Sequence, residues 1–371
     1  MGLNRDFWQD KSVFVTGHTG FKGSWLSLWL QRLGAKIYGY ALKPSSSPNL
    51  FDAARVENGM HSTIADVRNY PDIQKAMQTA RPQIAFHLAA QPLVRASYDN
   101  PVDTFAANVM GTVNFLEAVR NTPSIRVAVI VTSDKCYEND QGTMTFRETD
   151  RMGGNDPYSS SKGCAELVTA AYRRSFFNEG KVAIATVRAG NVIGGGDWAE
   201  DRLIPDLIRA FAKQRPLTLR YPQAVRPWQH VLEPLRGYLM LAEQLWHNPG
   251  VSNGGWNFGP NGDDAWPVVD VVRTAARIWG EGAHWIANTK TSLHEAHYLN
   301  LDCTLAREKL SWSPVTHLEQ ALDWTLSWYR CHMDGTIDMR KVTEAQIARY
   351  EELAMPVGHN PEFRMGACCG G

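Results

Sequence analysis

Short apolar runs alternate with longer amphipathic stretches through the first half of this chain, and this alternation is its strongest constraint on folding. The apolar runs predict strands at residues 12–16, 37–40, 84–88, 127–131 and 182–187. The stretches between them have helical periodicity, at residues 25–33, 70–80, 105–120 and 160–177. Such alternation predicts an α/β fold, a doubly wound parallel sheet with helices on both faces. Continuously apolar strands fit a sheet that is buried on both sides.

A glycine-rich turn, Thr-Gly-His-Thr-Gly-Phe-Lys-Gly at residues 16–23, follows the first predicted strand and opens the first predicted helix. Without a Cβ, glycine lets the chain turn tightly and lets backbone approach a pyrophosphate. The helix N-terminus adds N–H groups that favour phosphate. The turn therefore predicts a dinucleotide site built by Gly17, Thr19, Gly20, Phe21, Lys22 and Gly23.

The carboxylate that would grip the adenosine ribose after the second strand is missing, and residues 40–43 read Tyr-Ala-Leu-Lys instead. Lys43, Lys22 and His18 keep a 2′-phosphate, and so NADP, open as an alternative. We expect these three to be solvated surface residues, with NAD as the cofactor and weakly bound. Asp66 and Val67, taken to end a further strand between residues 40 and 84, are expected at the adenine edge.

The pattern loosens after about Gly194, where short strands at residues 217–221 and 256–259 lie among predicted helices at 203–212, 234–245, 268–279, 318–329 and 343–353. This favours a smaller mixed α/β substrate lobe. We predict a nucleotide-binding domain over residues 1–193, a lobe mainly within 194–335 with some segments returning to the core, and a C-terminal helix and tail over 336–371.

Composition excludes several classes of function. Lys plus Arg and Asp plus Glu each total 38, so no global basic field would attract nucleic acid. The first ten residues do not resemble a secretory signal, and the apolar runs are shorter than the roughly 20 residues of a membrane helix. Six cysteines without a C-x-x-C pair favour free thiols in a reducing cytosol. We expect a cytoplasmic protein without a metal site or a membrane partner.

A second group of residues carries acid–base chemistry. Ser133, Asp134 and Lys135 follow the apolar run 127–131, and Tyr158 and Lys162 lie four residues apart at the start of a predicted helix. This spacing puts Tyr158 and Lys162 on one helix face, where we expect the ammonium to lower the phenol's pKa. A tyrosine at its ordinary pKa of about 10 is a poor base near neutrality. A turn or helix cap without chemistry is the alternative reading of the Ser-Asp-Lys segment.

These motifs, in this order and with His87–Gln91 and Asn108 between them, resemble the extended short-chain dehydrogenase/reductase family over nearly the whole chain. The resemblance implies a Rossmann-type sheet, NAD as cofactor and a tyrosine base. It also implies further cofactor contacts at Asp66, Val67, Leu88, Ala89, Ala90, Gln91, Asn108, Thr132, Tyr158 and Lys162.

Asp134 and Lys135 discriminate between the reactions of this family. Its epimerases have inert residues after the catalytic serine, whereas its nucleotide-sugar 4,6-dehydratases have an acid–base pair, usually Asp-Glu in the dTDP-glucose enzymes. The Asp-Lys pair looks like the branch acting on CDP-glucose. That branch implies a hydro-lyase that oxidises C4, eliminates water across C5 and C6 and returns the hydride to C6, for deoxysugar biosynthesis of the O-antigen type.

The resemblance also implies a role for each of these side chains. Tyr158, helped by Ser133 and Lys162, removes the C4 hydroxyl proton. Asp134 is the expected acid for the C6 hydroxyl, and Lys135 the expected base for the C5 proton, with Glu138 as an alternative base.

Substrate contacts are expected at Asn191, Arg202, Leu217, Leu219, Arg226, His230 and Tyr298, and less securely at Arg188. A homodimer through the helices at 105–120 and 160–177 is also implied. A 4-epimerase, a reductase or a different nucleotide-sugar 4,6-dehydratase is the main alternative. A non-catalytic NAD-binding regulator is another, although retention of both Tyr158 and Lys162 argues against it.

Overall fold

A seven-stranded sheet forms the core of the protein, in a computed structural model that describes residues 2–139, 145–177, 182–250, 254–287 and 299–355. All of its neighbouring strands are parallel. From edge to edge the strands are β12 (Gly255–Phe258), β7 (Ala183–Ala189), β5 (Val127–Val131), β4 (Ile84–His87), β1 (Ser12–Thr16), β2 (Lys36–Ala41) and β3 (His61–Ile64). The strand order reverses between β1 and β4, which confirms the predicted doubly wound fold.

Helices cover both faces of the sheet because successive strand side chains point to opposite sides. Val127 and Val129 of β5 join the core layer under α2 (Phe21–Arg32) and α10 (Leu232–His247). Ala128 and Ile130 join the other layer, under α4 (Tyr70–Ala80) and α7 (Gly111–Arg120). The fully apolar run of β5 is therefore buried on both faces, as expected.

Several helices differ from their predicted bounds, and two of these differences bear on the site. The helix predicted at 105–120 is α6 (Pro101–Phe105), a π-helical turn (Ala106–Met110) and α7 in succession. The helix predicted at 160–177 is α8 (Pro157–Phe176), which begins three residues earlier. Pro157 fits the first position, where its missing N–H is not needed. Asp156 caps α8 by accepting from the Ser159 N–H at 2.9 Å, so Tyr158 lies in the first turn.

Residues 194–335 divide between the sheet and a separate lobe. Strand β12 and helix α10 belong to the core sheet and its covering layer, so the short strand expected at 256–259 is not part of the lobe. The lobe consists of α9 (Leu203–Ala212), α11 (Val268–Trp279), the pair β9 (Leu217–Leu219) and β14 (Trp285–Ala287), and the pair β10 (Val225–Pro227) and β13 (Ala265–Pro267).

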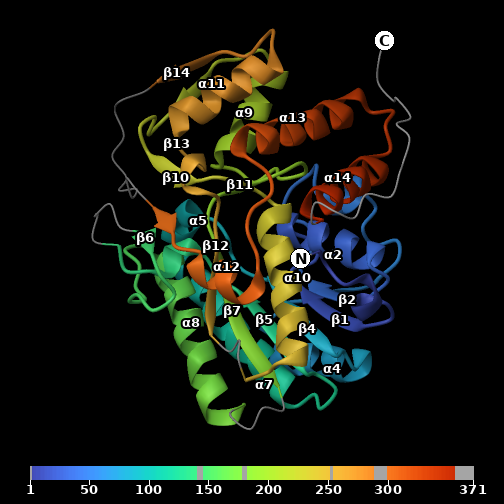
Figure 1. Ribbon diagram of the computed structural model, residues 1–371. Coiled ribbons are helices and arrows are strands. Elements are labelled where there is room, and N and C mark those ends of the chain that lie inside the picture. Colours follow the sequence, from blue (N-terminus) through green and yellow to red (C-terminus); the bar gives the residue numbers. More distant parts are fainter. Residues whose placement is uncertain (1, 140–144, 178–181, 251–253, 288–298, 356–371) are drawn as a thin grey trace.

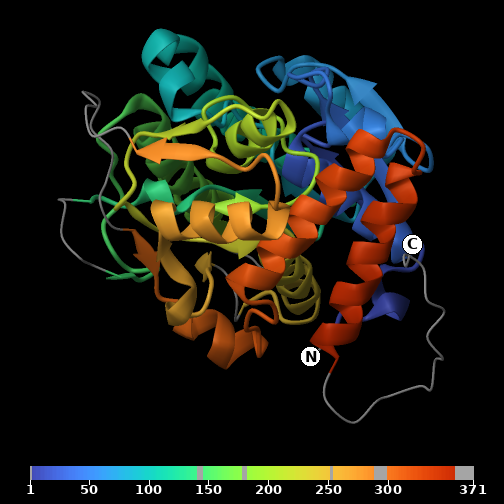
Figure 2. The same cartoon turned by 90° about the horizontal axis from the view of Figure 1, so that it is seen from above.

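The last helices pack back on the N-terminal part of the chain. Figure 2 shows α13 (Leu318–Asp334) and α14 (Met339–Ala354) side by side next to the first strands and helices. Trp29 of α2 meets Tyr350 of α14 edge to face, with ring centroids 5.6 Å apart. The other elements are α1 (Arg5–Trp8), α3 (Leu50–Ala53), α5 (Val94–Asp99), η2 (Asp134–Cys136), β6 (Thr145–Phe146), β8 (Val192–Ile193), β11 (Gln229–His230), η3 (Gly262–Asp264), β15 (Asn300–Leu301) and α12 (Thr304–Leu310).

In the part of the chain that the structure describes, no helix is long and apolar enough to cross a membrane.

The cap of α8 gives a first test of the fold. Asp156→Ala removes the acceptor for the Ser159 N–H and for the Ser159 hydroxyl, which lies 2.6 Å away. We expect the free energy of unfolding to fall by about 1 kcal/mol, measured by urea denaturation. Asp156→Asn keeps a capping oxygen and is the control; equal losses in both variants would contradict this role.

Candidate active site

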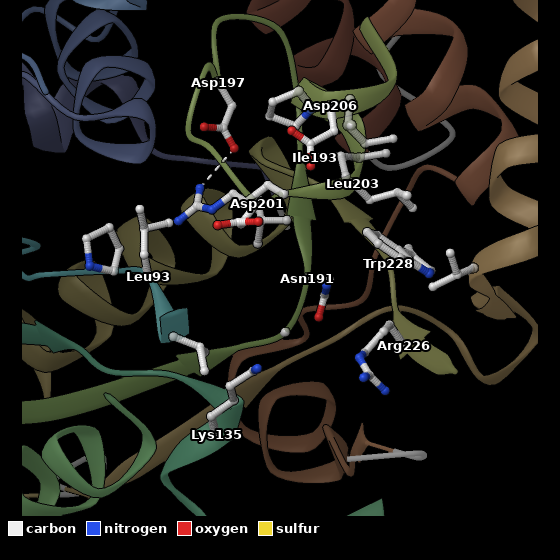
Figure 3. Close-up of a pocket in the computed structure, with 18 of the residues that line it drawn as sticks. Leu93, Lys135, Asn191, Ile193, Asp197, Asp201, Leu203, Asp206, Arg226 and Trp228 are labelled. Atoms are coloured by element: carbon white, nitrogen blue, oxygen red, sulfur yellow. Dashed lines mark hydrogen bonds and ion pairs between the residues drawn. The ribbon is translucent and has the colours of Figure 1, made fainter. Parts of the chain in front are cut away.

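A pocket opens at the carboxyl ends of the sheet strands, between the core and the lobe (Figure 3). Open α/β sheets bind ligands at this edge, beside the point where the strand order reverses. The core contributes Lys22, Ser133, Asp134, Lys135 and Tyr158 to its wall. The opposite wall comes from the segment after β7 and from the lobe, with Asn191, Arg202, Leu217, Leu219, Arg226 and Trp228.

The glycine-rich turn is packed too tightly for other residues. Gly17 has φ +74°, and a Cβ there would lie 2.8 Å from the Ala89 nitrogen. A Cβ on Gly23 would lie 2.0 Å from the Gly17 carbonyl oxygen, so α2 starts directly on the turn. Thr19 donates to the Leu42 carbonyl at 2.8 Å, which fixes the turn against the end of β2. The first-turn N–H groups of α2 are thereby presented as a phosphate site.

Some expected cofactor contacts are engaged within the protein. Asn108 accepts from the Gln91 N–H at 2.8 Å and donates to the Ser161 hydroxyl at 2.8 Å, so it holds the loop after β4 against α8. Thr132 donates to Glu166 at 2.5 Å. The side chains of Asn108 and Thr132 therefore hold other parts of the protein in place around the site. Asp66 forms an ion pair with Arg68 at 2.7 Å, just after β3.

Of the three residues expected at the surface near the second strand, the structure exposes Lys43 alone. His18 is completely buried and its Nε2 lies 2.7 Å from the Ser62 hydroxyl. Burial lowers the pKa of His18 to about 4, so this imidazole is neutral at pH 7 and offers a 2′-phosphate no charge. Lys22 lines the pocket, where burial lowers its pKa to about 8. The expectation was wrong for His18, which packs against Phe51 and Ser62 in the core, and for Lys22, which is half-buried in the pocket wall.

The acid–base turn, Ser133, Asp134 and Lys135, leaves the end of β5 as part of a single 3₁₀ turn. The Ser133 hydroxyl caps this turn by accepting from the Lys135 N–H at 3.2 Å, and it donates to Asp134 Oδ1 at 3.0 Å. Asp134 is only 4% exposed, and its Oδ2 has no hydrogen-bond partner among the described residues. Burial raises the pKa of the Asp134 carboxyl, opposed by the charge of Lys135. This carboxyl is consequently biased toward its protonated form.

Tyr158 and Lys162 lie on the face of α8 that packs against this turn. Lys162 Nζ donates to the Val131 carbonyl at 3.3 Å. Burial raises the pKa of Tyr158 to about 12, and the hydrogen bond from Ser133 is the main opposing influence. Burial also lowers the pKa of Lys162 to about 8. The net pKa of the phenol lies above its ordinary value because desolvation of the tyrosine dominates, and the lowering expected from Lys162 stays a prediction.

The substrate residues predicted from the sequence separate into two groups. Asn191, Arg202, Leu217, Leu219 and Arg226 all line the pocket. The other three residues are placed differently: His230 is completely buried, Arg188 is buried against Glu166, and Tyr298 lies outside the described residues.

His230 packs between Trp25 and Trp324, at centroid distances of 5.8 and 5.5 Å. Arg188 pairs with Glu166 at 2.8 Å beneath the turn. The residues expected to bind substrate at these two positions therefore belong to the core.

The structure adds charged residues that the sequence patterns missed. Asp201 accepts from Arg220 at 2.9 Å and lies 3.2 Å from Arg95, which joins the lobe to α5 across the pocket mouth. Asp197 pairs with Arg202 at 2.9 Å. Neither periodicity nor a motif marks these positions, since they lie in an irregular loop, and the Arg95 partner of Asp201 is distant in sequence. The alternative base, Glu138, is exposed and outside the pocket wall.

The family model described as "NAD dependent epimerase/dehydratase family" matches residues 13–255 of this chain, which include the glycine-rich turn, the acid–base turn and the Tyr158–Lys162 pair. The chain belongs to the NAD dependent epimerase/dehydratase family. This membership agrees with the resemblance to extended short-chain dehydrogenases and with NAD as the cofactor.

Within the NAD dependent epimerase/dehydratase family, the chain is 47% identical over 353 residues to the CDP-glucose 4,6-dehydratase of Salmonella typhimurium, covering 94% of this chain and 98% of that relative. Two solved structures share the fold. An epimerase from Methanothermobacter thermautotrophicus has a TM-score of 0.78 at 20% identity, covering 91% of this chain and 96% of that one. A dTDP-glucose 4,6-dehydratase from Bacillus anthracis in complex with NAD has a TM-score of 0.72 at 21% identity. The match covers 90% of this chain and 99% of that one.

The site fits the cofactor of the NAD dependent epimerase/dehydratase family. Because Gly17 and Gly23 have no Cβ, the turn backbone and the N-terminus of α2 are accessible to a pyrophosphate. The neutral, buried His18 and the exposed Lys43 supply no built site for a 2′-phosphate. Among the described residues, no group of three or more His, Cys, Asp or Glu side chains is placed to hold a metal ion.

The hydrogen bond between Ser133 and Tyr158 predicts a pH effect. It lowers the Tyr158 pKa, so Ser133→Ala raises that pKa and leaves less phenolate at any given pH. We expect the acid limb of the pH profile for C4 oxidation to move to higher pH, measured from the initial rate of NADH formation. Ser133→Thr keeps a hydroxyl and is the control; an unmoved acid limb in Ser133→Ala would refute the effect.

Proposed function

We propose that this protein is a CDP-glucose 4,6-dehydratase, a hydro-lyase that converts CDP-D-glucose to CDP-4-keto-6-deoxy-D-glucose. The observation that carries the proposal is the buried Asp134 carboxyl, which shares the pocket of Tyr158 and is followed directly by Lys135. An epimerase needs a redox site alone, whereas a dehydratase also needs an acid and a base. The identity of 47% across nearly the full length of a CDP-glucose 4,6-dehydratase supports both the reaction and the nucleotide.

Oxidation at C4 uses the residues of α8. NAD would be held at the glycine-rich turn by the backbone around Gly17, Gly20 and Gly23, and it would supply the acceptor for the C4 hydride and the donor for C6. Tyr158 removes the proton of the C4 hydroxyl, and Ser133 favours the phenolate by hydrogen bonding to it. Lys162 lies on the same face of α8, so its ammonium is near the phenolate that forms. The proton thus passes to Tyr158, whose side chain is buried in the pocket wall.

Elimination uses the acid–base turn. The C4 ketone acidifies the proton on C5; Lys135 removes it and, after exchange with solvent, gives a proton back to C5 when hydride reaches C6. Asp134 gives a proton to the C6 hydroxyl, which leaves as water. The raised pKa of Asp134 suits this role, because a buried carboxyl whose Oδ2 has no partner among the described residues keeps a proton to donate.

Ser133 connects the two halves of the reaction. Its hydroxyl lies 3.0 Å from Asp134 Oδ1 and also hydrogen-bonds Tyr158. A hydroxyl has one proton to donate and two lone pairs to accept with. When Asp134 is protonated it donates to Ser133, which leaves the Ser133 proton for the phenolate. The state of Asp134 needed for elimination is therefore also the state that favours the oxidising form of Tyr158.

The wall of the pocket opposite the acid–base turn suits a sugar nucleotide. Arg226 and Arg202 supply guanidinium groups that match a diphosphate, and Asn191 faces the same space between Lys135 and Arg226 (Figure 3). Strand β9, with Leu217 and Leu219, lines the end of the pocket away from the acid–base turn, where its backbone groups would contact the nucleobase. We assign cytosine there from the Salmonella relative.

We further infer a homodimer through α6, α7 and α8. Val102 is 80% exposed, Leu167 61% and Met110 52%, although all three are apolar. Tyr98 on α5, Phe105 on α6 and Phe176 on α8 are exposed as well. A large exposed apolar patch on a soluble monomer favours burial against a partner. We place the enzyme in the cytoplasm, in deoxysugar biosynthesis of the O-antigen type.

A 4-epimerase is the second candidate, since epimerases share the fold and the tyrosine site. Solvent exchange separates the two reactions. We expect the purified protein with NAD and CDP-glucose in deuterated water to form a 4-keto-6-deoxy sugar that carries deuterium at C5, measured by NMR and mass spectrometry. UDP-, dTDP- and GDP-glucose test the nucleobase. An unlabelled CDP-galactose product would favour the epimerase, and no turnover of any sugar nucleotide would favour a regulator.

Variants of Lys135 and Asp134 should impair different steps of the elimination. Lys135→Ala is expected to lose C5 deuterium exchange by about 100-fold or more while still oxidising C4. Asp134→Asn, which cannot give up a proton as an acid, is expected to exchange C5 but release water slowly. Rapid-quench analysis of the sugar and of NADH measures both steps. Normal C5 exchange in Lys135→Ala would rule out lysine as the base.

The dimer has its own test. Val102→Glu with Leu167→Glu places charges on the proposed interface, and we expect monomers by analytical ultracentrifugation. Ile286→Glu is the control, because Ile286 is 54% exposed on β14 of the lobe. An unchanged association state in the double variant would show that these helices do not form the interface.

A further inference from the structure

A buried ion pair between Glu166 and Arg188 lies directly beneath the acid–base turn and takes no part in the steps above. We propose that Glu166 and Arg188 are positioning residues that hold the acid–base turn against the helix carrying Tyr158 and Lys162. This proposal rests on the proposed function. Both residues act chiefly on elimination, because they fix where Asp134 and Lys135 stand relative to the sugar held at Tyr158.

The pair holds the N-terminal end of the turn. Glu166 lies on α8 one helical turn after Lys162 and receives both Nε and Nη2 of Arg188 at 2.8 Å. Its Oε1 also accepts from the Thr132 hydroxyl at 2.5 Å, and its Oε2 from the Thr186 hydroxyl at 2.6 Å. Thr132 immediately precedes Ser133. The beginning of the turn is thus hydrogen-bonded to the helix that carries the catalytic tyrosine.

The same pair also holds the C-terminal end. Arg188 Nη1 donates to the Tyr137 hydroxyl at 2.6 Å, and that hydroxyl donates to Asn257 Oδ1 at 2.7 Å on β12. Tyr137 follows the last residue of the 3₁₀ turn. Its ring stacks on Phe146 at a centroid distance of 4.9 Å. Both ends of the acid–base turn are therefore attached to one planar guanidinium–carboxylate pair.

Two glycines let the backbone approach this arrangement. A Cβ on Gly255 would lie 2.1 Å from Arg188 Nη2, so only glycine at this position of β12 leaves room for the guanidinium. A Cβ on Gly163 would lie 2.7 Å from the Gly153 carbonyl oxygen and 3.3 Å from that of Cys136, which α8 approaches at this point. The bidentate Glu166–Arg188 pair is therefore closely packed. Because its fork geometry is fixed, it also fixes the positions of the residues hydrogen-bonded to it.

The redox residues have attachments of their own. The Tyr158 N–H donates to the Ser97 hydroxyl at 3.1 Å, and Lys162 donates to the Val131 carbonyl. Both persist when the Tyr137 end of the turn is released. Asp134 and Lys135, by contrast, must reach C6 and C5 of a sugar whose C4 is held at Tyr158. A misplacement of about 1 Å costs such a step up to about 100-fold.

Tyr137→Phe tests the proposal with an isosteric change. It removes the hydroxyl that links Arg188 to Asn257 and keeps the ring stacked on Phe146. In single turnovers of the full-length protein with NAD and CDP-glucose, we expect C4 oxidation within about twofold of wild type, followed as NADH absorbance. C5 deuterium exchange and 4-keto-6-deoxy product should fall about 10- to 100-fold, so that NADH and the 4-keto-glucose intermediate accumulate.

Tyr350→Phe is the matched control. The Tyr350 hydroxyl is likewise buried in a Glu–Arg arrangement, donating to Glu233 at 2.6 Å and accepting from Arg236 at 3.1 Å, but on α14. It should change thermal stability by a similar amount and leave the ratio of elimination to oxidation unchanged. Arg188→Lys is a second variant: it keeps a cation beside Glu166 but loses the bidentate fork, and should shift the ratio in the same direction as Tyr137→Phe.

A ratio in Tyr137→Phe equal to that in Tyr350→Phe, or an equal loss of both steps, would overturn the positioning role. Loss of oxidation alone would do the same. A wild-type protein that forms no 4-keto-6-deoxy product would instead refute the proposed function. Thermal melting of each variant identifies those that are folded at the assay temperature, and the ratio is taken from these.

Discussion

The close packing of α8 against the end of β5 is the constraint on which the rest of the site depends. It brings Tyr158 and Lys162 from a helix to a hydroxyl, a carboxyl and an amine that leave a strand. Burial at this contact raises the pKa values of Tyr158 and Asp134 and lowers that of Lys162. The same exclusion of water that perturbs these groups makes their hydrogen bonds effective, since a low dielectric strengthens each of them.

Buried charge is distributed unevenly around this contact. Beneath the turn, Glu166 and Arg188 satisfy each other and their neighbours completely enough to serve as a rigid support. Above it, Asp134 Oδ2 faces no hydrogen-bond partner among the residues that the structure describes. A satisfied buried network fixes geometry, whereas an unsatisfied buried group is available for chemistry. The two kinds of polar group lie on opposite sides of one short turn.

Sequence reasoning succeeded where a local pattern carries the physics. The continuous apolar runs predicted strands β1, β2, β4, β5 and β7, and the three glycines predicted the phosphate turn that the close contacts of Gly17 and Gly23 explain. It failed where burial by distant segments decides. His18 and Lys22 look like surface cations in the sequence, and Arg188 and His230 look like ligand residues. Packing under β2, against α8 and between two tryptophans places His18, Arg188 and His230 in the core.

The sequence by itself determined the sheet, the turn that fits a dinucleotide and the order of Ser133, Asp134, Lys135, Tyr158 and Lys162, because each depends on residues close together in the chain. Only the tertiary structure decided which of these groups are desolvated and which share a hydrogen bond. Those properties depend on elements such as β12 and α10, which return to the sheet from far along the chain. A pKa reflects the whole surroundings of a group, and no short segment of sequence contains them.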